Sequence, residues 1–111
     1  MKVIHYSDIE PSPVNMDGAE GVTIRWLISD KDGAPNFAMR LFEVEPGGTT
    51  PLHTHSHEHE VFILEGNGAV WRNGEEVAVT VGTAIFVPPN EKHCFMNKGE
   101  TVLKLICLVP I

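Results

Sequence analysis

The stretch Pro51-Leu52-His53-Thr54-His55-Ser56-His57-Glu58-His59-Glu60 carries four of the six histidines of the chain, at alternate positions. Neutral imidazole is the most common protein ligand for borderline transition metals. In an extended strand, residues i and i+2 point to the same face, so His53 and His55 can direct both rings at one ion. The stretch therefore predicts a metal site. A fifth histidine, His93, ends a second tight segment that begins at Pro88-Pro89.

On both sides of this stretch, turn signals divide the sequence into short β-rich runs. Ten glycines and eight prolines punctuate the 111 residues, and no segment repeats apolar residues at a helical period over ten positions. So many short strands in one chain predict an all-β fold, a closed or two-sheet antiparallel barrel. The expected strands are 22–29, 36–45, 49–55, 59–65, 69–72, 75–79, 83–87, 93–96 and 102–109, with a hairpin turn at Asn73-Gly74.

The length of the chain favours one domain. Residues 1–21 contain Pro11, Pro13, Gly18 and Gly21, which exclude a long regular element, so this segment is expected to be an N-terminal arm. Residues 22–111 are expected to form a single β-barrel domain.

Charge and composition argue against several classes of partner. The formal net charge is −7 and the eight basic residues are scattered, so neither nucleic acid nor an anionic membrane surface is an expected partner. No apolar run is long enough to span a membrane, and the N-terminus lacks the apolar core of a signal peptide. The expected location is cytoplasmic. Cys94 and Cys107 form no CxxC pair, which leaves a zinc finger without support.

Two spaced motifs surround the histidines. The first reads Gly47-x5-His53-x-His55-x3-His59-x6-Gly66, and the second reads Gly82-x5-Pro88-x-Asn90-x2-His93-x3-Asn97. Together they span residues 47–97 and resemble the two signature motifs of the cupin superfamily. The resemblance implies a double-stranded β-helix, or jelly-roll, barrel. It also implies one divalent metal ion inside the barrel, held by His53, His55, His59 and His93.

Two positions depart from the family pattern, because His59 stands where Glu is usual and Asn90 stands where Gly is usual. Glu60 is adjacent to His59, and a slip of one residue would exchange the two faces of the strand. Counting back from Gly66, the spacing of six residues in the family motif falls on His59, so the resemblance implies that His59 is the ligand and that Glu60 faces away. A short turn at residues 56–58 is expected to join the two ligand strands, which would make His57 an exposed turn residue.

Four other polar residues are candidates for roles outside the ligand set. Arg25 and Arg40 could each anchor a carboxylate, but an ion pair at the surface with Glu43 or Glu45 is the favoured interpretation. By alternation, Cys94 is expected to face away from His93. Asn97 is expected to contact a metal ligand from behind or to brace its loop.

Four neutral ligands would leave the ion at its full charge of about +2, which would attract an anionic bidentate molecule. The resemblance implies an oxygenase-type enzyme that acts on a small anionic substrate, with manganese or iron favoured and zinc, nickel or copper possible. It also implies a homodimer. Three alternatives stay open: a metal-dependent isomerase or epimerase, a non-catalytic metal- or ligand-binding module, and a purely structural zinc site.

Overall fold

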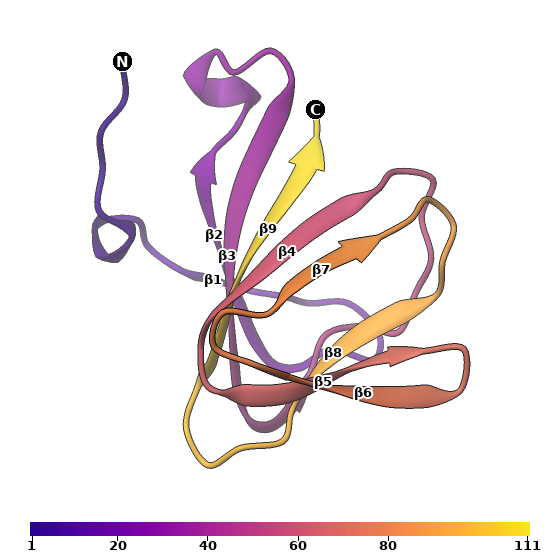
Figure 1. Cartoon of the computed structure of the whole chain (residues 1–111). Helices are drawn as coiled ribbons and strands as arrows, with labels where there is room; N and C mark the ends of the chain where they lie inside the picture. The colour runs from indigo at the N-terminus through magenta and orange to yellow at the C-terminus, as the bar shows by residue number, and fades with distance from the viewer.

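Nine β-strands form one strongly curled antiparallel sheet (Figure 1). The computed structural model describes all residues 1–111. The strands are β1 (Ser12–Pro13), β2 (Glu20–Ile28), β3 (Phe37–Thr49), β4 (His59–Glu65), β5 (Asn67–Arg72), β6 (Glu75–Thr80), β7 (Ala84–Val87), β8 (His93–Asn97) and β9 (Leu103–Pro110). Two 3-10 helices, η1 (Tyr6–Asp8) and η2 (Asp30–Asp32), are the only helices, and neither is long and apolar enough to cross a membrane. The predicted all-β fold is confirmed.

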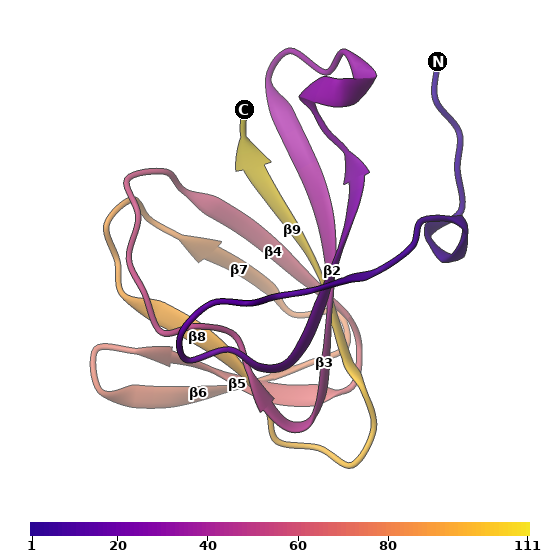
Figure 2. The ribbon, with the colours of Figure 1, turned by 180° about the vertical axis from the view of Figure 1, so that it is seen from behind.

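The long strand β3 joins the two walls of the curled sheet. The strand order is β6-β5-β8-β3-β9-β4-β7, and β2 pairs with β3 as a further neighbour. The first part of β3 pairs with β9 from Phe37 to Val44, whereas its last residue, Thr49, pairs with Met96 of β8. Figures 1 and 2 show the resulting half-barrel, with β2, β3, β9, β4 and β7 in one wall and β8, β5 and β6 in the other.

Alternation along the strands directs one face into the half-barrel. In β4, His59, Val61 and Ile63 are buried, whereas Glu60 and Phe62 are exposed. In β9, every second residue from Leu103 to Val109 is buried. This period of two is expected for strands with one face on the core. The largest fully buried side chains are Leu41, Val44, Ile63, Leu103, Leu105 and Cys107.

The predicted hairpin at Asn73-Gly74 is also confirmed. Arg72 of β5 pairs with Glu75 of β6, so the loop contains only these two residues. Both have positive φ, +47° for Asn73 and +81° for Gly74, as the right-handed twist of a two-residue hairpin requires.

The prediction of a separate strand at residues 49–55 is wrong. The strand β3 continues through Pro46-Gly47-Gly48 to Thr49, and residues 50–58 then form a loop. Within this loop only His53 pairs with a strand, through an isolated bridge to His93. One reason is Pro51, which has no amide hydrogen to donate to a sheet. His53 and His55 therefore lie on a loop rather than on a strand adjacent to β4.

Candidate metal centre

Backbone hydrogen bonds bring the four histidines predicted as ligands to one end of the half-barrel. His59 begins β4 and His93 begins β8, while His53 and His55 lie on the loop between β3 and β4. The amide of His53 donates to the carbonyl oxygen of His93 at 3.2 Å, and the amide of His93 donates back at 3.1 Å. The amide of Asn90 donates to the carbonyl oxygen of His55 at 2.8 Å. Both motif segments are thus held together by their backbones.

The imidazole rings of these four residues lie side by side. Ring centroids are 5.0 Å apart for His53 and His55, and 5.2 Å apart for His53 and His93. His55 lies 4.2 Å from His59 and 5.1 Å from His93, and the His59 and His93 rings are 5.4 Å apart. The structure therefore assembles all four predicted residues into one cluster.

Hydrogen bonds to the backbone fix the tautomer of three of these rings. Each of the three directs its Nδ1 atom at a carbonyl oxygen, which can only accept, so Nδ1 carries the hydrogen. The Nε2 atom then keeps its lone pair for a metal ion, as in known histidine sites. The contacts are His53 to Pro51 at 2.7 Å, His55 to His57 at 2.8 Å, and His93 to Glu91 at 2.8 Å.

Two buried nitrogen atoms of the cluster have no hydrogen-bond partner in the protein. They are the Nε2 atoms of His55 and His59. A buried polar atom without a partner costs on the order of 1–3 kcal/mol. A metal ion in the cluster would coordinate these atoms and remove that cost. The donor set, all imidazole, suits a divalent transition metal.

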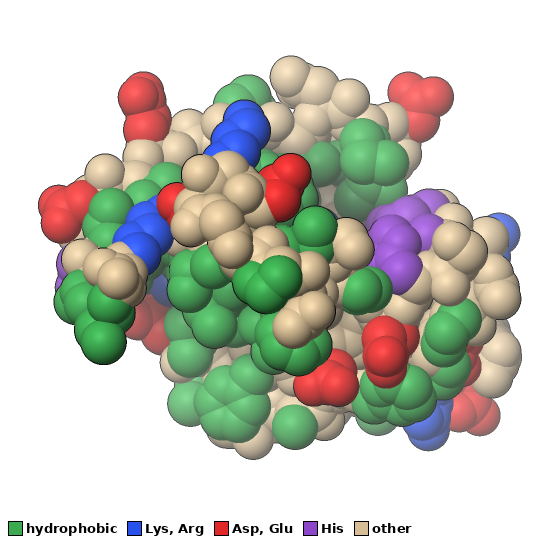
Figure 3. Space-filling view, turned by 90° about the horizontal axis from the view of Figure 1, so that it is seen from above, with side chains coloured by type: hydrophobic (Ala, Val, Ile, Leu, Met, Phe, Trp, Pro, Cys, Tyr) green, Lys and Arg blue, Asp and Glu red, His purple; other side chains and the backbone are tan.

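The ligand nitrogens divide into two overlapping groups. Those of His53, His55 and His93 lie within 4.8 Å of one another, and so do those of His55, His57 and His59. His57 is exposed on a bend, as predicted, but its ring also stacks on that of His55 at a centroid distance of 4.0 Å. Alternation at two-residue spacing was the only sequence signal for this proximity. Figure 3 shows histidine side chains reaching the surface beside apolar side chains.

Burial keeps the cluster neutral. Removal from water lowers the pKa of His59 to about 3, and the neighbouring His55 and Arg40 charges act in the same direction. Removal from water is also the main cause that lowers the pKa of His55 and the pKa of His93. Because only neutral imidazole binds a metal, these three rings are in a ligating state at neutral pH.

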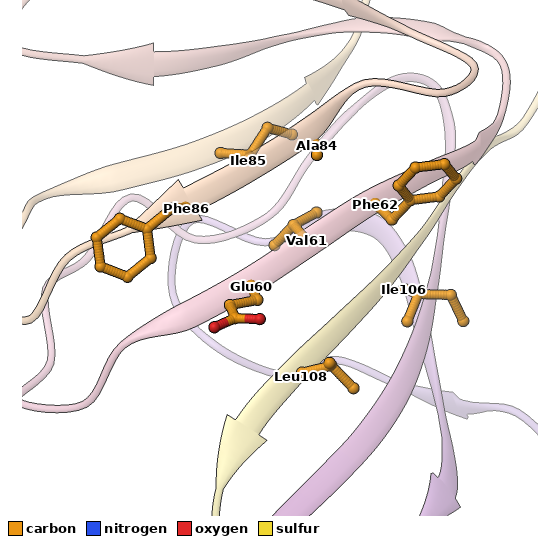
Figure 4. A pocket seen from close by; sticks show the side chains of 8 residues that line it. All are labelled: Glu60, Val61, Phe62, Ala84, Ile85, Phe86, Ile106 and Leu108. Carbon is orange, nitrogen blue, oxygen red and sulfur yellow. The ribbon is translucent and has the colours of Figure 1, made fainter.

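The predicted register of β4 is confirmed. His59 is 7% exposed and faces the interior, whereas Glu60 is exposed on the opposite face. Figure 4 shows Glu60 on β4, between Phe86 of β7 and Leu108 of β9. Glu60 therefore cannot join the cluster without a shift of the strand by one residue.

A small cavity of about 90 Å³ opens onto the cluster. Its lining includes His53, His59 and His93, together with Arg40, Cys107 and apolar side chains. No carboxylate side chain is among the twelve lining residues. Arg40 is therefore the single formally charged side chain that lines the cavity, and its positive charge favours an anionic occupant.

The outer face of the sheet carries a larger but chemically different hollow. This groove, about 490 Å³ in volume, lies over β7, β4 and β9 and has seven apolar residues among its eight (Figure 4). It contains no histidine, and Glu60 is its single charged residue. This groove therefore lacks the side chains that a transition-metal site needs.

The two arginines have different environments. Arg25 forms the expected ion pair, with its Nε atom 2.9 Å from a carboxylate oxygen of Glu43, although both side chains are mostly buried rather than on the surface. The prediction of an ion pair is wrong for Arg40. Its guanidinium has no carboxylate within ion-pair distance and lies over the rings of Trp26 and Phe42, at 5.5 and 5.0 Å. Its buried Nε atom has no partner.

Cys107 is a site residue that the sequence did not identify. Its Sγ atom lies 2.9 Å from Nδ1 of His59, and Arg40 donates to the same sulfur at 3.0 Å. Burial raises the pKa of the thiol, while the charge of Arg40 opposes that change. Alternation in residues 102–109 could have directed Cys107 inward, but only the pairing of β4 with β9 puts it beside His59.

The remaining polar predictions concern structure. Asn97 is 3% exposed and braces the turn after β8, because its amide donates to the carbonyl oxygens of Val44 and Thr101, both at 2.8 Å. Its Oδ1 atom accepts from the amide of Gly99. Cys94 and Cys107 are both buried and form no disulfide.

Comparisons with known proteins agree with this geometry. Residues 40–109 match the family described as Cupin domain. The oxalate-binding protein of Thermotoga maritima is 32% identical over 112 residues, which cover 96% of this chain and 92% of that protein.

Two solved structures have the same architecture. The polyketide cyclase RemF from Streptomyces resistomycificus has a TM-score of 0.93 and 37% identity, covering 99% of this chain and 79% of that one. A protein described as a predicted oxalate decarboxylase from Thermotoga maritima has a TM-score of 0.88 and 27% identity, with 99% of both chains covered. The predicted jelly-roll barrel is thereby confirmed, and the chain belongs to the cupin family.

Proposed function

We propose that the protein binds one divalent metal ion through His53, His55, His59 and His93 and uses it in oxygenase-type chemistry on a small anionic molecule. The observation that carries this proposal is the cluster itself. Four rings converge, three of them have Nδ1 tied to a carbonyl oxygen, and the buried Nε2 atoms of His55 and His59 lack a partner. These features favour a site prepared for metal coordination.

Arg40 supports an anionic substrate. It lines the same cavity as three of the histidines, has no carboxylate partner, and keeps a buried Nε–H without an acceptor. A guanidinium binds a carboxylate through two parallel hydrogen bonds and remains charged at any physiological pH. The rings of Trp26 and Phe42 hold the guanidinium in place. A carboxylate in the cavity would therefore contact Arg40 at one end and the metal centre at the other.

The size of the cavity favours a small substrate. A volume of about 90 Å³ corresponds to roughly three water molecules at their liquid volume. A polyketide chain is much larger than this, so the activity in the name of RemF is not the one we propose. A dicarboxylate such as oxalate or a short α-keto acid fits both the volume and the charge, and one relative is named an oxalate-binding protein.

The metal supplies chemistry that the side chains lack. When bound, a redox-active divalent ion such as manganese or iron supplies Lewis acidity and electron transfer to an oxidant such as dioxygen. The four neutral histidines leave its charge undiminished, and Arg40 orients the anion. Isomerase chemistry would need a general base, and no carboxylate lines the cavity. Binding without turnover is the second candidate function, because the Thermotoga maritima relative is named for binding.

The proposal includes a homodimer, which is common in the family. The outer groove over β7, β4 and β9 supports it, because Phe62 and Phe86 are 46% and 58% exposed there. An exposed apolar groove with a single charged residue is typical of a surface that binds a partner. A second copy of the chain presents the same apolar face, and β7 ends the strand order beside it.

Metal analysis combined with anion titration tests this function. Protein purified without chelator or nickel resin is expected to contain one metal ion per chain by elemental analysis. Calorimetry with the manganese-loaded protein is expected to show oxalate binding that is lost without metal and in Arg40→Met. Consumption of dioxygen with turnover supports an oxygenase, whereas oxalate binding without turnover supports a binding module. A protein that retains no divalent metal contradicts both candidates.

A further inference from the structure

We propose that Cys107 is the positioning residue for His59 and that it links this ring to the anion-binding guanidinium of Arg40. The inference rests on the proposed function, in which His59 is a metal ligand and Arg40 receives the substrate. It concerns how the two are connected. The structure provides the link through a single sulfur atom that contacts both residues.

His59 differs from the other three histidines of the cluster in what holds its Nδ1 atom. The other three rings contact backbone carbonyl oxygens, which can only accept a hydrogen bond. The Nδ1 atom of His59 instead contacts the Sγ atom of Cys107 at 2.9 Å. A thiol can donate through S–H or accept through sulfur. The direction of this one hydrogen bond decides whether Nδ1 or Nε2 of His59 carries the hydrogen.

Only one of these directions is compatible with metal binding. If S–H donates to Nδ1, the hydrogen of His59 lies on Nε2 and blocks coordination. If Nδ1–H donates to sulfur, Nε2 has a lone pair, and this buried atom has no other partner. By accepting from Nδ1–H, the sulfur of Cys107 keeps the hydrogen off Nε2 of His59, as the carbonyl oxygens do for the other rings. Unlike a carbonyl oxygen, a thiol can also donate, so the direction of this hydrogen bond can reverse.

Arg40 is the group that acts on the sulfur. One guanidinium nitrogen donates to Sγ at 3.0 Å, while the Nε–H of the same side chain is buried without an acceptor. A carboxylate in the cavity would attract these donors, because a charge-assisted hydrogen bond to oxygen is stronger than one to sulfur. Occupancy of the anion site would then alter the hydrogen bonding of Cys107 and, through it, that of His59.

The effect on metal affinity is expected to resemble that of other contacts that orient metal ligands. Removing such a contact weakens metal binding by roughly 10-fold to 100-fold in known sites. Cys107→Ala is therefore expected to raise the dissociation constant for Co²⁺ at least about 10-fold. Cys107→Ser keeps a hydroxyl that can accept from His59 and Arg40, so it is expected to remain within about threefold of the wild type.

A structural role for a core side chain would also weaken binding, so a second readout is needed. In Zn²⁺-loaded protein, the Nδ1–H proton of His59 is expected to give a slowly exchanging NMR signal. That signal is expected to persist in Cys107→Ser and to disappear in Cys107→Ala. Oxalate is expected to shift it in the wild type, because a carboxylate that draws the Arg40 donors away from sulfur changes the hydrogen bonding of Cys107.

The outcomes separate this inference from the proposed function. If the wild type binds neither Co²⁺ nor Zn²⁺, the proposed function fails. If the wild type binds metal and oxalate, but Cys107→Ala keeps both the affinity and the His59 signal, the role of Cys107 is contradicted. Since Cys107 is 1% exposed, Cys107→Ala could destabilise the fold. In that event Cys107→Val decides, because it keeps a side chain of similar volume but cannot form either hydrogen bond, and a wild-type affinity for Co²⁺ in this variant overturns the role of Cys107. If the wild type binds oxalate while its His59 signal does not shift, the link to Arg40 is overturned.

Discussion

His53 and His93, which lie in different motifs, are joined by two backbone hydrogen bonds of 3.2 and 3.1 Å. They form an isolated antiparallel bridge, and their ring centroids are 5.2 Å apart. Residues paired in this way have Cα atoms about 5.5 Å apart whatever their side chains. The backbone pairing thus brings His93 of the second motif to His53 of the first. This part of the histidine cluster is assembled by backbone hydrogen bonds within the fold.

Asn90 is expected to tolerate glycine but not a branched residue. Its φ of +69° lies in the left-handed region, and its amide holds the carbonyl oxygen of His55. Glycine and asparagine adopt this conformation readily, whereas a β-branched side chain is strained there. Asn90→Val is expected to lower the free energy of unfolding by about 1–2 kcal/mol, with little change for Asn90→Gly. Thermal unfolding of both variants checks this, and equal melting temperatures would contradict it.

Removing His59 is expected to weaken metal binding on the order of 100-fold, because one ligand of four accounts for a few kcal/mol of the affinity. Glu60→Ala is the matched control, since its side chain points to the outer face of the same strand. It is expected to leave metal binding unchanged. Competition with a fluorescent zinc chelator measures both.

His57→Ala distinguishes the two overlapping groups of nitrogens. Because His57 is exposed, its loss is expected to change the metal affinity less than about threefold. A decrease in metal affinity as large as the one expected for His59→Ala would instead place the ion between His55, His57 and His59.

The metal-free protein is expected to lose stability as the pH falls below about 6.5. The pKa of His59 is lowered from 6.5 to about 3 in the folded state, so the unfolded chain binds more protons between these values. The contribution of His59 to the free energy of unfolding is constant above this window and falls by about 1.4 kcal/mol per pH unit within it. His55 and His93 act in the same direction. Urea unfolding between pH 8 and pH 4.5 in the presence of a chelator measures how the free energy of unfolding depends on pH. His59→Gln should reduce this dependence. An identical dependence in the variant would count against the burial of a neutral His59.

The outer groove is expected to be the dimer interface. Phe62→Glu and Phe86→Glu each place a charge on the apolar face, and an unpaired charge in an interface costs several kcal/mol. Both variants are expected to be monomeric by light scattering at concentrations where the wild type is dimeric. Glu75→Lys is the control and should not change the mass, because β6 lies at the opposite end of the strand order from β7 and contributes no residue to the groove. A monomeric wild type would contradict this interface.

Local rules explain why much of this structure could be predicted from the sequence. Strand period and the Asn73-Gly74 turn are properties of neighbouring residues, and they predicted the all-β fold. The inward register of His59 was predicted from the family's spacing between this residue and Gly66. The strand at 49–55 failed because alternation of histidines resembles a strand, whereas Pro51 and the isolated bridge of His53 leave this segment as a loop.

Long-range pairing explains what could not be predicted. The environment of Arg40 depends on its alignment with Cys107 across β3 and β9, and that of Cys107 depends on the alignment of β4 with β9. No local pattern contains these registers. The sequence offers Glu43 and Glu45 as partners for either arginine, but only Arg25 reaches Glu43 because the two lie on neighbouring strands, β2 and β3.

The most direct test of the central claim is a crystal structure of the protein loaded with one equivalent of Zn²⁺, with anomalous data collected at the zinc edge. We predict one anomalous peak per chain, about 2.0–2.1 Å from the Nε2 atoms of His53, His55, His59 and His93. A peak coordinated by His57 instead, or one that leaves His93 beyond bonding distance, would contradict the account.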